Sequence, residues 1–339
     1  MASRVVNAGL LVAGLALLGC GGTAPAQGAP PSSALLSTAL HRVVRCLEPE
    51  RGPFEVQRDQ DLVVLVHGCN SSIAKFKNLA EVFRSRGQQA ACFTYDDRDS
   101  LISVADELNV ALDALHHELG TGRITVVGHS QGGLIARQAS TAVDKSPAQV
   151  TQLVTISTPF SGIHSARDCG FLPLHIFTFG ITVGVCQIIA GRKWTEIHDR
   201  APFMLRPPPL APEVARHLAV MTDETGSCLD QQGPSCGHDD FIFSLQEQAL
   251  NYVNETRVEP LVVRSGHTEI VGEGGRVPVV LISVLEAEGI LRPSPAAGLA
   301  ERQALLERIY RGEAEISGAI SCCEEWTSGG KARARHSSL

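Results

Sequence analysis

The feature that most constrains the fold is a regular alternation of apolar runs and amphipathic segments, which begins near residue 60. The runs are "DLVVLVHG" (61–68), "QAACFTYD" (89–96), "RITVVG" (123–128) and "VTQLVTIST" (150–158). Short, nearly continuous apolar runs are typical of strands that are buried on both faces of a sheet. Strands that alternate with helices predict an α/β fold with a mostly parallel central sheet and helices on both faces.

The segments between these runs have the spacing and the boundaries of helices. Residues 71–87 begin with serines and end at a glycine, and apolar side chains recur every three or four positions from Val104 to Leu119. Serine favours a helix start and glycine a helix end. Further along, "HLAVMT" (217–222) and "EPLVVRSG" (259–266) predict two more strands, and "VPVVLISVLEAEG" predicts a last helix.

These patterns divide the chain after residue 19 into three parts. Residues 59–290 carry the alternating pattern and are predicted to form one α/β domain, which residues 160–212 interrupt with an irregular insert. Residues 20–58 combine a Pro-, Ala- and Ser-rich tether with an N-terminal strand region. Residues 291–339 predict one amphipathic helix, "AERQALLERIY", followed by a disordered tail.

The first 19 residues predict a signal peptide. Arg4 precedes a short apolar run, and "LLGC" ends it at Cys20. This ending resembles a bacterial lipobox, which implies that Cys20 is lipidated and that the protein is an exported lipoprotein of the cell envelope, anchored to a membrane. Secretion with cleavage after Ala26 is the alternative.

Cysteine and charge content limit the other classes of function. Cys20 leaves nine of the ten cysteines, and export permits disulfides. We favour the pairs Cys228–Cys236, around a loop with Gly and Pro, and Cys169–Cys186. No C-x-x-C spacing indicates a zinc site, and neither a metal nor another cofactor is expected. A net charge of −7 argues against nucleic acid as a partner, and protein partners are not indicated.

The predicted catalytic feature is "ITVVGHSQGGL" (124–134), in which Gly-x-Ser-x-Gly lies between a strand and a helix. Such a turn projects the serine hydroxyl above the sheet edge and points the first helix amides at it. Gly128 and Gly132 remove side chains that would collide with the strand and the helix. Ser130 is therefore the predicted nucleophile rather than a serine in an ordinary turn.

With "VVLVHGCNSS", "VVGHSQGGL", "VTISTPFSG", "GHDDFIFS" and "VRSGHTEI", the chain resembles the α/β-hydrolase fold family and, within it, bacterial lipases and esterases. The resemblance covers about residues 60–290. It implies the order nucleophile, acid, histidine along the chain.

The resemblance implies a base and an acid near the end of the domain. His267 fits the base, because it follows the last predicted strand directly. For the acid we favour Asp240, which precedes "FIF" in a pattern similar to that of the family. Asp239 and Asp223 stay open as alternatives, because the glycine that the family pattern expects after the acid is Phe241 here.

Two backbone N–H groups are expected to form the oxyanion hole, those of Cys69 and Gln131. The combined features predict a serine carboxylic-ester hydrolase, lipase- or esterase-like, that forms an acyl-enzyme. An acyltransferase or thioesterase with the same residues is the first alternative. A non-catalytic envelope binding lipoprotein with this fold is the second.

The insert carries the expectation for the substrate. Residues 169–191, "CGFLPLHIFTFGITVGVCQIIAG", contain no charged side chain and are long enough to cross a bilayer. A crossing would separate Ser130 from His267, so we expect an apolar cap or lid over the site instead. Such a cover favours an ester with a fatty acyl chain, or another acyl ester, as the substrate. An additional core helix is the plainer interpretation.

Overall fold

The computed structural model describes residues 38–46, 54–69, 73–142, 150–164, 193–232, 235–296 and 298–317. The predicted signal peptide, Cys20, the apolar segment 169–191 with its proposed Cys169–Cys186 pair, and the C-terminal tail from residue 318 lie outside the described residues. Within the described residues no helix is both long and apolar enough to cross a membrane.

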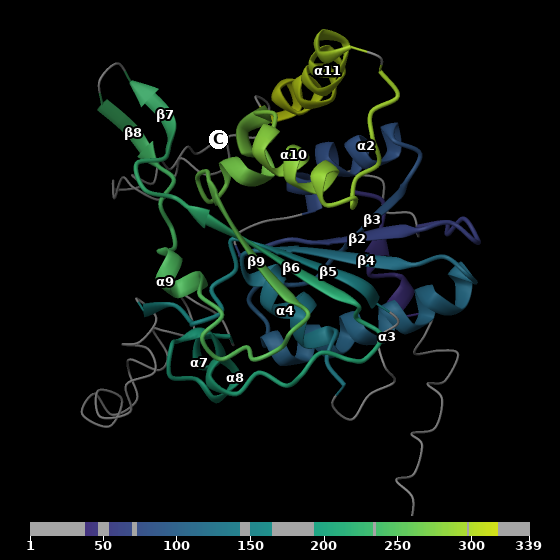
Figure 1. Ribbon diagram of the computed structural model, residues 1–339, viewed down its shortest axis with the longest axis vertical. Helices are drawn as coiled ribbons and strands as arrows, with labels where there is room; N and C mark the ends of the chain where they lie inside the picture. The colour runs from purple at the N-terminus through teal and green to yellow at the C-terminus, as the bar shows by residue number, and fades with distance from the viewer. Residues whose placement is uncertain are drawn as a thin grey trace, which may run out of the picture. The chain divides into compact units, whose positions relative to one another are not determined.

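A seven-stranded sheet forms the centre of the domain (Figure 1). Its strands are β1 (Val43–Val44), β2 (Leu62–Val66), β3 (Gln89–Phe93), β4 (Ile124–His129), β5 (Val150–Ile156), β6 (Arg216–Asp223) and β9 (Val258–Arg264). They follow the spatial order β1-β3-β2-β4-β5-β6-β9, and only the two-residue β1 runs antiparallel to its neighbour. The predicted fold class, a mostly parallel sheet, is confirmed.

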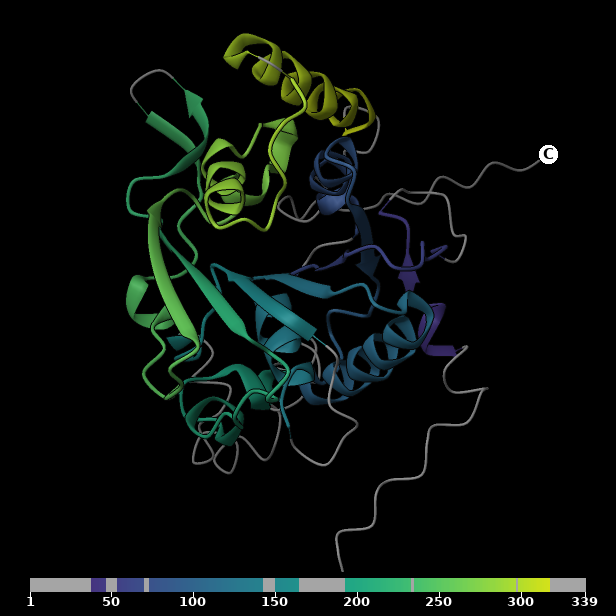
Figure 2. The same cartoon turned by 45° about the vertical axis from the view of Figure 1, so that its right-hand side comes forward.

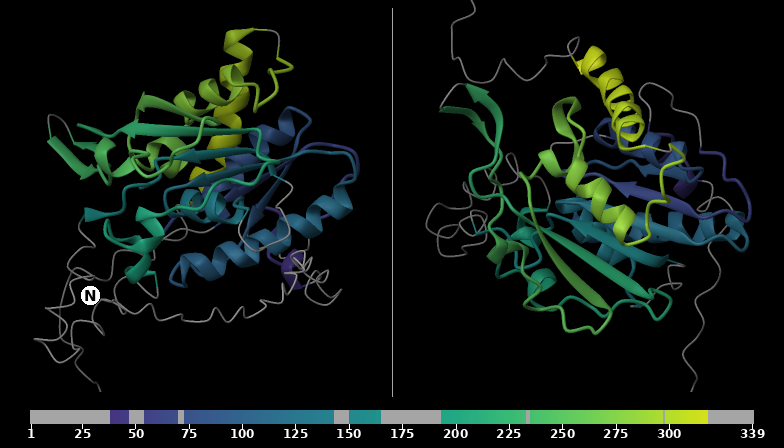
Figure 3. Two further views of the ribbon diagram at one scale, coloured as in Figure 1. Left: turned by 60° about the horizontal axis from the view of Figure 1, so that its bottom comes forward. Right: turned by 45° about the horizontal axis from the view of Figure 1, so that its top comes forward.

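Helices cover both faces of this sheet (Figures 1, 2 and 3). One face carries α3 (Leu101–Leu119) and α4 (Gln131–Ala139), and the other carries α2 (Lys77–Ser85), α10 (Val279–Ala287) and α11 (Leu299–Ser317). Short helices α7 (Trp194–Ile197), α8 (Pro202–Leu205) and α9 (Leu245–Gln248) and 3-10 turns η1 (Ile73–Phe76), η3 (Glu269–Val271) and η4 (Glu273–Gly275) complete the described elements.

Alternate residues of the central strands supply two separate cores. Leu62, Val64 and Val66 of β2 pack with the apolar residues of α3 and α4. Val63 and Leu65 pack with those of α2, α10 and α11. Because successive side chains of a strand point to opposite faces, a strand inside both cores must be apolar throughout. This explains the uninterrupted runs in the sequence.

Two features of the structure could not be predicted from the periodic pattern of the sequence. A disulfide, Cys46–Cys92, ties the segment after β1 to β3, and no spacing in the sequence indicates this pair. Strands β7 (Cys228–Gln232) and β8 (Ser235–Asp239) form a separate hairpin. All of β8 is exposed, so no apolar alternation marks it in the sequence. The predicted disulfide Cys228–Cys236 is confirmed and joins the two strands of this hairpin.

Candidate active site

Ser130 lies on a strained turn at the carboxyl end of β4. Its φ of 55° lies in a region that is unfavourable for a residue with a side chain, and its N–H donates to the Ile156 carbonyl at 2.9 Å. Such backbone strain costs about 1–3 kcal/mol and persists only where the surroundings enforce it. The helix α4 begins at the next residue. The predicted strand–turn–helix around Ser130 is therefore present.

The loop after β2 packs directly against this turn. A Cβ atom on Gly68 would come within 2.9 Å of the Ser130 Cβ, and a Cβ on Gly132 would come within 2.3 Å of the Val66 and His67 carbonyl oxygens. Only glycine permits both approaches. The next residue, Cys69, is thereby held beside the nucleophile candidate.

His267 reaches the site from the loop after β9. His129, the neighbour of Ser130, forms a hydrogen bond through Nε2 with the His267 carbonyl oxygen at 2.8 Å, and the two rings lie 4.8 Å apart. The rings of Phe243 and His267 pack in a T-shaped arrangement with their centroids 4.9 Å apart. Only 6% of His267 is exposed. The sequence places Ser130 and His267 at different strand ends, and the structure brings the two segments together.

The carboxylate that contacts the His267 ring is Glu224, the first residue after β6. Its Oε1 lies 3.0 Å from the imidazole Nδ1, and the side chain is fully buried. Its Oε2 accepts the backbone N–H groups of Ile242 and Phe243 at 2.6 and 2.8 Å. Glu224 is not among the acids predicted from the sequence.

The expectation that Asp240 would meet the imidazole is wrong. Its carboxylate accepts the N–H groups of Thr268 and Glu269 at about 3 Å and the Thr268 hydroxyl at 2.8 Å. Its own carbonyl accepts the His267 N–H at 3.0 Å. A side chain saturated by these backbone donors has no contact with the ring. Asp240 anchors the loop that carries His267.

The two alternative acids also lie elsewhere. Asp239, exposed on β8, accepts the N–H of Phe241 at 3.1 Å. Asp223 ends β6 and accepts the N–H of Thr225 at 3.2 Å. Both are ordinary turn contacts of a short carboxylate. Neither side chain contacts His267.

Two hydroxyl groups complete the acid–histidine network. Ser157, at the carboxyl end of β5, donates from Oγ to Glu224 at 2.6 Å and lies 2.8 Å from the His267 Nδ1. The Thr222 hydroxyl lies 2.8 Å from Ser157 Oγ and 2.9 Å from Glu224. Since the only hydroxyl proton of Ser157 is used on Glu224, both neighbours of Nδ1 act as acceptors there. The imidazole therefore carries its proton on Nδ1, which leaves Nε2 as the basic nitrogen.

The electrostatics agree with this assignment. Burial alone would raise the pKa of Glu224, but hydrogen bonds from His267, Ser157 and Phe243 hold that pKa below its ordinary value. Burial holds the pKa of His129 well below its usual range, and the neighbouring His267 lowers it further. Glu224 is thus an anion and His129 a neutral ring near neutral pH.

The side chain of Lys193 contacts both predicted oxyanion residues, Cys69 and Gln131. The amine of Lys193, which is only 4% exposed, bonds Cys69 Sγ at 2.9 Å and Gln131 Oε1 at 2.6 Å. Within the part of the chain that is described, the backbone N–H groups of Cys69 and Gln131 donate to no acceptor. Two such amides beside a serine can stabilise an anionic oxygen. Cys69 is a free thiol.

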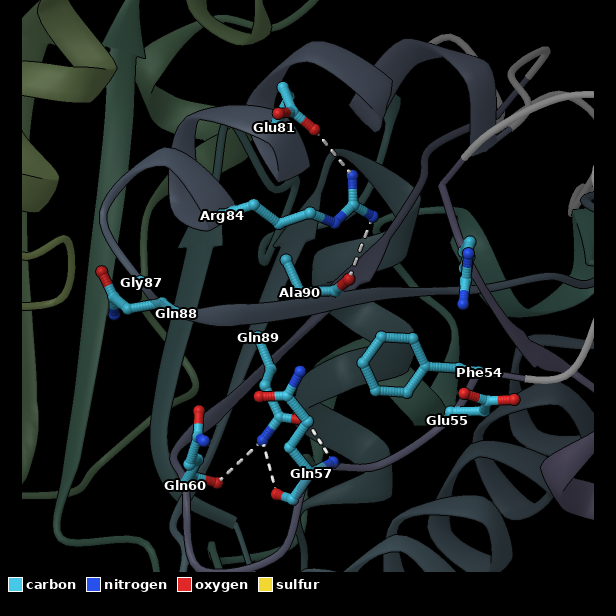
Figure 4. Close-up of a pocket in the computed structure, with 11 residues that line it drawn as sticks. Phe54, Glu55, Gln57, Gln60, Glu81, Arg84, Gly87, Gln88, Gln89 and Ala90 are labelled. Carbon is cyan, nitrogen blue, oxygen red and sulfur yellow. Dashed lines mark hydrogen bonds and ion pairs between the residues drawn. The ribbon is translucent and has the colours of Figure 1, made fainter.

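A separate pocket lies at the amino ends of β2 and β3, away from the carboxyl ends of the strands that carry Ser130, Glu224 and His267 (Figure 4). It encloses about 480 Å³ and is lined by residues that precede or begin β2 and β3, among them Gln60, Gln89 and Arg84. Ser130, Glu224 and His267 all follow the carboxyl ends of strands, which is where ligands bind in open α/β sheets. This pocket is therefore not the candidate active site. Among the described residues no group of His, Cys, Asp or Glu is arranged to hold a metal ion.

The chain is similar to one protein family over part of its length and to several solved structures. Residues 62–201 match the model of the palmitoyl protein thioesterase family, which is less than half of the chain. No curated protein is significantly similar in sequence. Among solved structures, the mature Bacillus licheniformis lipase BlEst2 is 15% identical over 69% of this chain and 94% of its own, with a TM-score of 0.43. YbtT, a type II thioesterase of the yersiniabactin pathway, is 12% identical over 72% and 96%, with a TM-score of 0.42.

Proposed function

Because the chain has the α/β-hydrolase fold, we propose that it is a serine hydrolase that cleaves acyl esters through Ser130, His267 and Glu224. One observation carries the proposal: a buried carboxylate holds Nδ1 of a histidine whose loop is bonded to the residue before a strained serine. A structural turn needs no such arrangement. The pattern of nucleophile, oriented base and orienting acid is the one that activates a hydroxyl group.

The reaction follows from these positions. Nε2 of His267 takes the Ser130 proton while the serine oxygen attacks the ester carbonyl. Glu224 holds the ring and stabilises the positive charge that forms on it. The imidazolium then gives its proton to the leaving alcohol. Water, activated by the same nitrogen, hydrolyses the acyl-enzyme and restores Ser130.

The substrate carbonyl oxygen becomes negative during the attack. The N–H groups of Cys69 and Gln131 are the donors we assign to it, since both are unpaired within the described residues and flank Ser130. The dipole of α4, which begins at Gln131, also favours negative charge there.

A thioester is the second candidate substrate. The match to palmitoyl protein thioesterases covers the loop after β2, the Ser130 turn and Lys193, but it ends before Glu224 and His267. It favours an acyl thioester, and the charge-free segment 169–191 favours a fatty acyl group in either case. The same three residues would serve both leaving groups.

Hydrolysis of p-nitrophenyl esters from acetate to palmitate, together with palmitoyl thioesters, tests the proposal. Ser130→Ala should abolish turnover and labelling by a fluorophosphonate, because it removes the hydroxyl group that attacks the carbonyl or the phosphorus atom. Ser85→Ala is the matched control, since its hydroxyl donates to the Val82 carbonyl within α2, away from the candidate site. Equal rates for wild type and Ser130→Ala would reject catalysis and favour a binding protein.

We also propose that the enzyme is tethered to a membrane through lipidated Cys20, as the lipobox-like "LLGC" suggests. Cys20→Ala should release the protein from the membrane fraction and abolish incorporation of labelled fatty acid. Continued labelling of this variant would refute the anchor.

A further inference from the structure

We propose that Lys193 is a positioning residue of the oxyanion hole, one that holds Cys69 and Gln131 in register. The inference rests on the proposed function. Lys193 precedes α7 and lies in the chain between β5 and β6, far in sequence from both oxyanion residues. Sequence patterns gave it no role.

The amine of Lys193 is fully used in joining three segments. An ammonium has three N–H donors. They meet Cys69 Sγ at 2.9 Å, Gln131 Oε1 at 2.6 Å and the Asp97 carbonyl oxygen at 2.5 Å. These acceptors follow β2, begin α4 and follow β3, respectively. One side chain therefore ties the three strand ends that border this side of Ser130.

The link to Gln131 is reinforced from its other end. Its Nε2 donates to the same Asp97 carbonyl at 3.1 Å, so the amide is held on both sides. Gln131 is 2% exposed. These hydrogen bonds therefore hold Gln131, and with it the Gln131 backbone N–H, next to Ser130.

The positive charge of Lys193 also suits the negative charge that forms in the oxyanion hole. A buried ammonium is costly unless an anion or hydrogen bonds compensate it. Within the described residues its partners are a thiol, an amide oxygen and a carbonyl, and no ion pair joins it to a carboxylate. The negative oxygen that forms during attack develops beside the two residues that the ammonium binds. Attraction between buried charges then favours the transition state over the ground state.

The first test is Lys193→Met, which replaces the aliphatic part of the side chain by one of similar size and removes the three donors. We expect kcat for an ester to fall about ten- to a hundredfold, less than for loss of a direct oxyanion donor, with KM unchanged within about twofold. Phosphonylation of Ser130 by a fluorophosphonate should slow in parallel. Lys77→Met is the control, because Lys77 makes no hydrogen bond or ion pair among the described residues.

A double-mutant cycle separates positioning from general stability. Gln131→Leu removes the side-chain acceptor and keeps the backbone N–H. If Lys193 acts through Gln131, the double variant should lose about as much kcat as Lys193→Met alone, because contacting residues are not additive. Fully additive losses, or a wild-type kcat in folded Lys193→Met, would overturn the inference.

Lys193→Gln is the second variant in case Lys193→Met does not fold. It buries no charge and cannot supply three donors with one amide group, so kcat should again fall. A folded Lys193→Gln with wild-type kcat would overturn the proposal. If the wild type itself turns over no ester while Ser130→Ala behaves identically, the proposed function fails. If Ser130→Ala alone is inactive, only the Lys193 inference is at stake.

Discussion

Glu224 and Asp240 are both buried beside His267, yet they hold different parts of it. Glu224 contacts the ring at Nδ1, and its remaining oxygen accepts two backbone N–H groups. The Asp240 carboxylate bonds the Thr268 and Glu269 N–H groups and the Thr268 hydroxyl, and the Asp240 carbonyl accepts the His267 N–H. One carboxylate orients the imidazole, and the other shapes the loop that delivers it.

The difference lies in where each residue leaves the sheet. Thr222 and Glu224 are fully buried, whereas Asp223 between them is partly exposed. Residues two apart share a side of a strand, so β6 sends Thr222 and Glu224 into the site and Asp223 outward. Asp240 comes from the segment after the β8 strand and meets the site from outside the sheet.

The largest effect is expected for Glu224→Gln. The amide can present an N–H to Nδ1 and so favour the wrong histidine tautomer. We expect kcat to fall about 10³- to 10⁴-fold, as in other serine hydrolases that lose the acid. Steady-state kinetics on a p-nitrophenyl ester measures this, with Glu81→Gln on the surface of α2 as control. A loss below about tenfold would mean that Glu224 does not orient the base.

The next effect is expected for Ser157→Ala. The hydroxyl of Ser157 donates to Glu224 and accepts from Nδ1 of His267, so its loss removes one hydrogen bond from each of these two side chains. Hydrogen bonds to charged groups contribute about 1.5–3 kcal/mol, which predicts a fall in kcat of about ten- to a hundredfold. Ser161→Ala is the matched control, because its hydroxyl donates to the Ala249 carbonyl instead. Equal kcat for the two variants would exclude Ser157 from the network.

The sheet, the covering helices and the Ser130 turn could be predicted because their signals are local. Apolar runs, cap residues and the glycines around Ser130 each act within a few positions of the chain. The disulfide Cys46–Cys92 and the exposed hairpin β7–β8 could not be predicted, since one depends on distant strands and the other buries no apolar side chain.

The contact between Glu224 and His267 was not predicted, because the family pattern favoured Asp240 and Asp239 near "FIF". The strand "HLAVMT" ends two residues before Glu224. Period-two counting from buried Val220 reaches Thr222 and then Glu224. Lys193 carries no such signal, because its contacts exist only after the three strand ends have assembled.

Asp240→Asn is expected to affect stability more than catalysis. The new amide group would face the Thr268 or Glu269 N–H, so one donor would lose its partner. Loss of such a buried hydrogen bond costs about 1–3 kcal/mol, measurable by chemical denaturation. We expect kcat to stay within about threefold of wild type, since Glu224 still holds the ring. A loss as large as that of Glu224→Gln would erase the distinction between the two carboxylates.

The smallest effect concerns acid stability. The pKa of Glu224 is lower in the folded protein than its ordinary value of 4.5, despite the opposing effect of burial, because of its bonds to His267 and Ser157. A carboxylate with a lowered pKa stabilises the fold above its unfolded pKa, and this contribution disappears as pH falls through the folded value. The difference in unfolding free energy between wild type and Glu224→Gln should therefore be larger near neutral pH than below 4.5. The unfolding free energy of Ser130→Ala, which removes no titrating group, should change with pH as that of the wild type does. A difference between wild type and Glu224→Gln that stays constant with pH would show that the partners of Glu224 do not stabilise its anionic form.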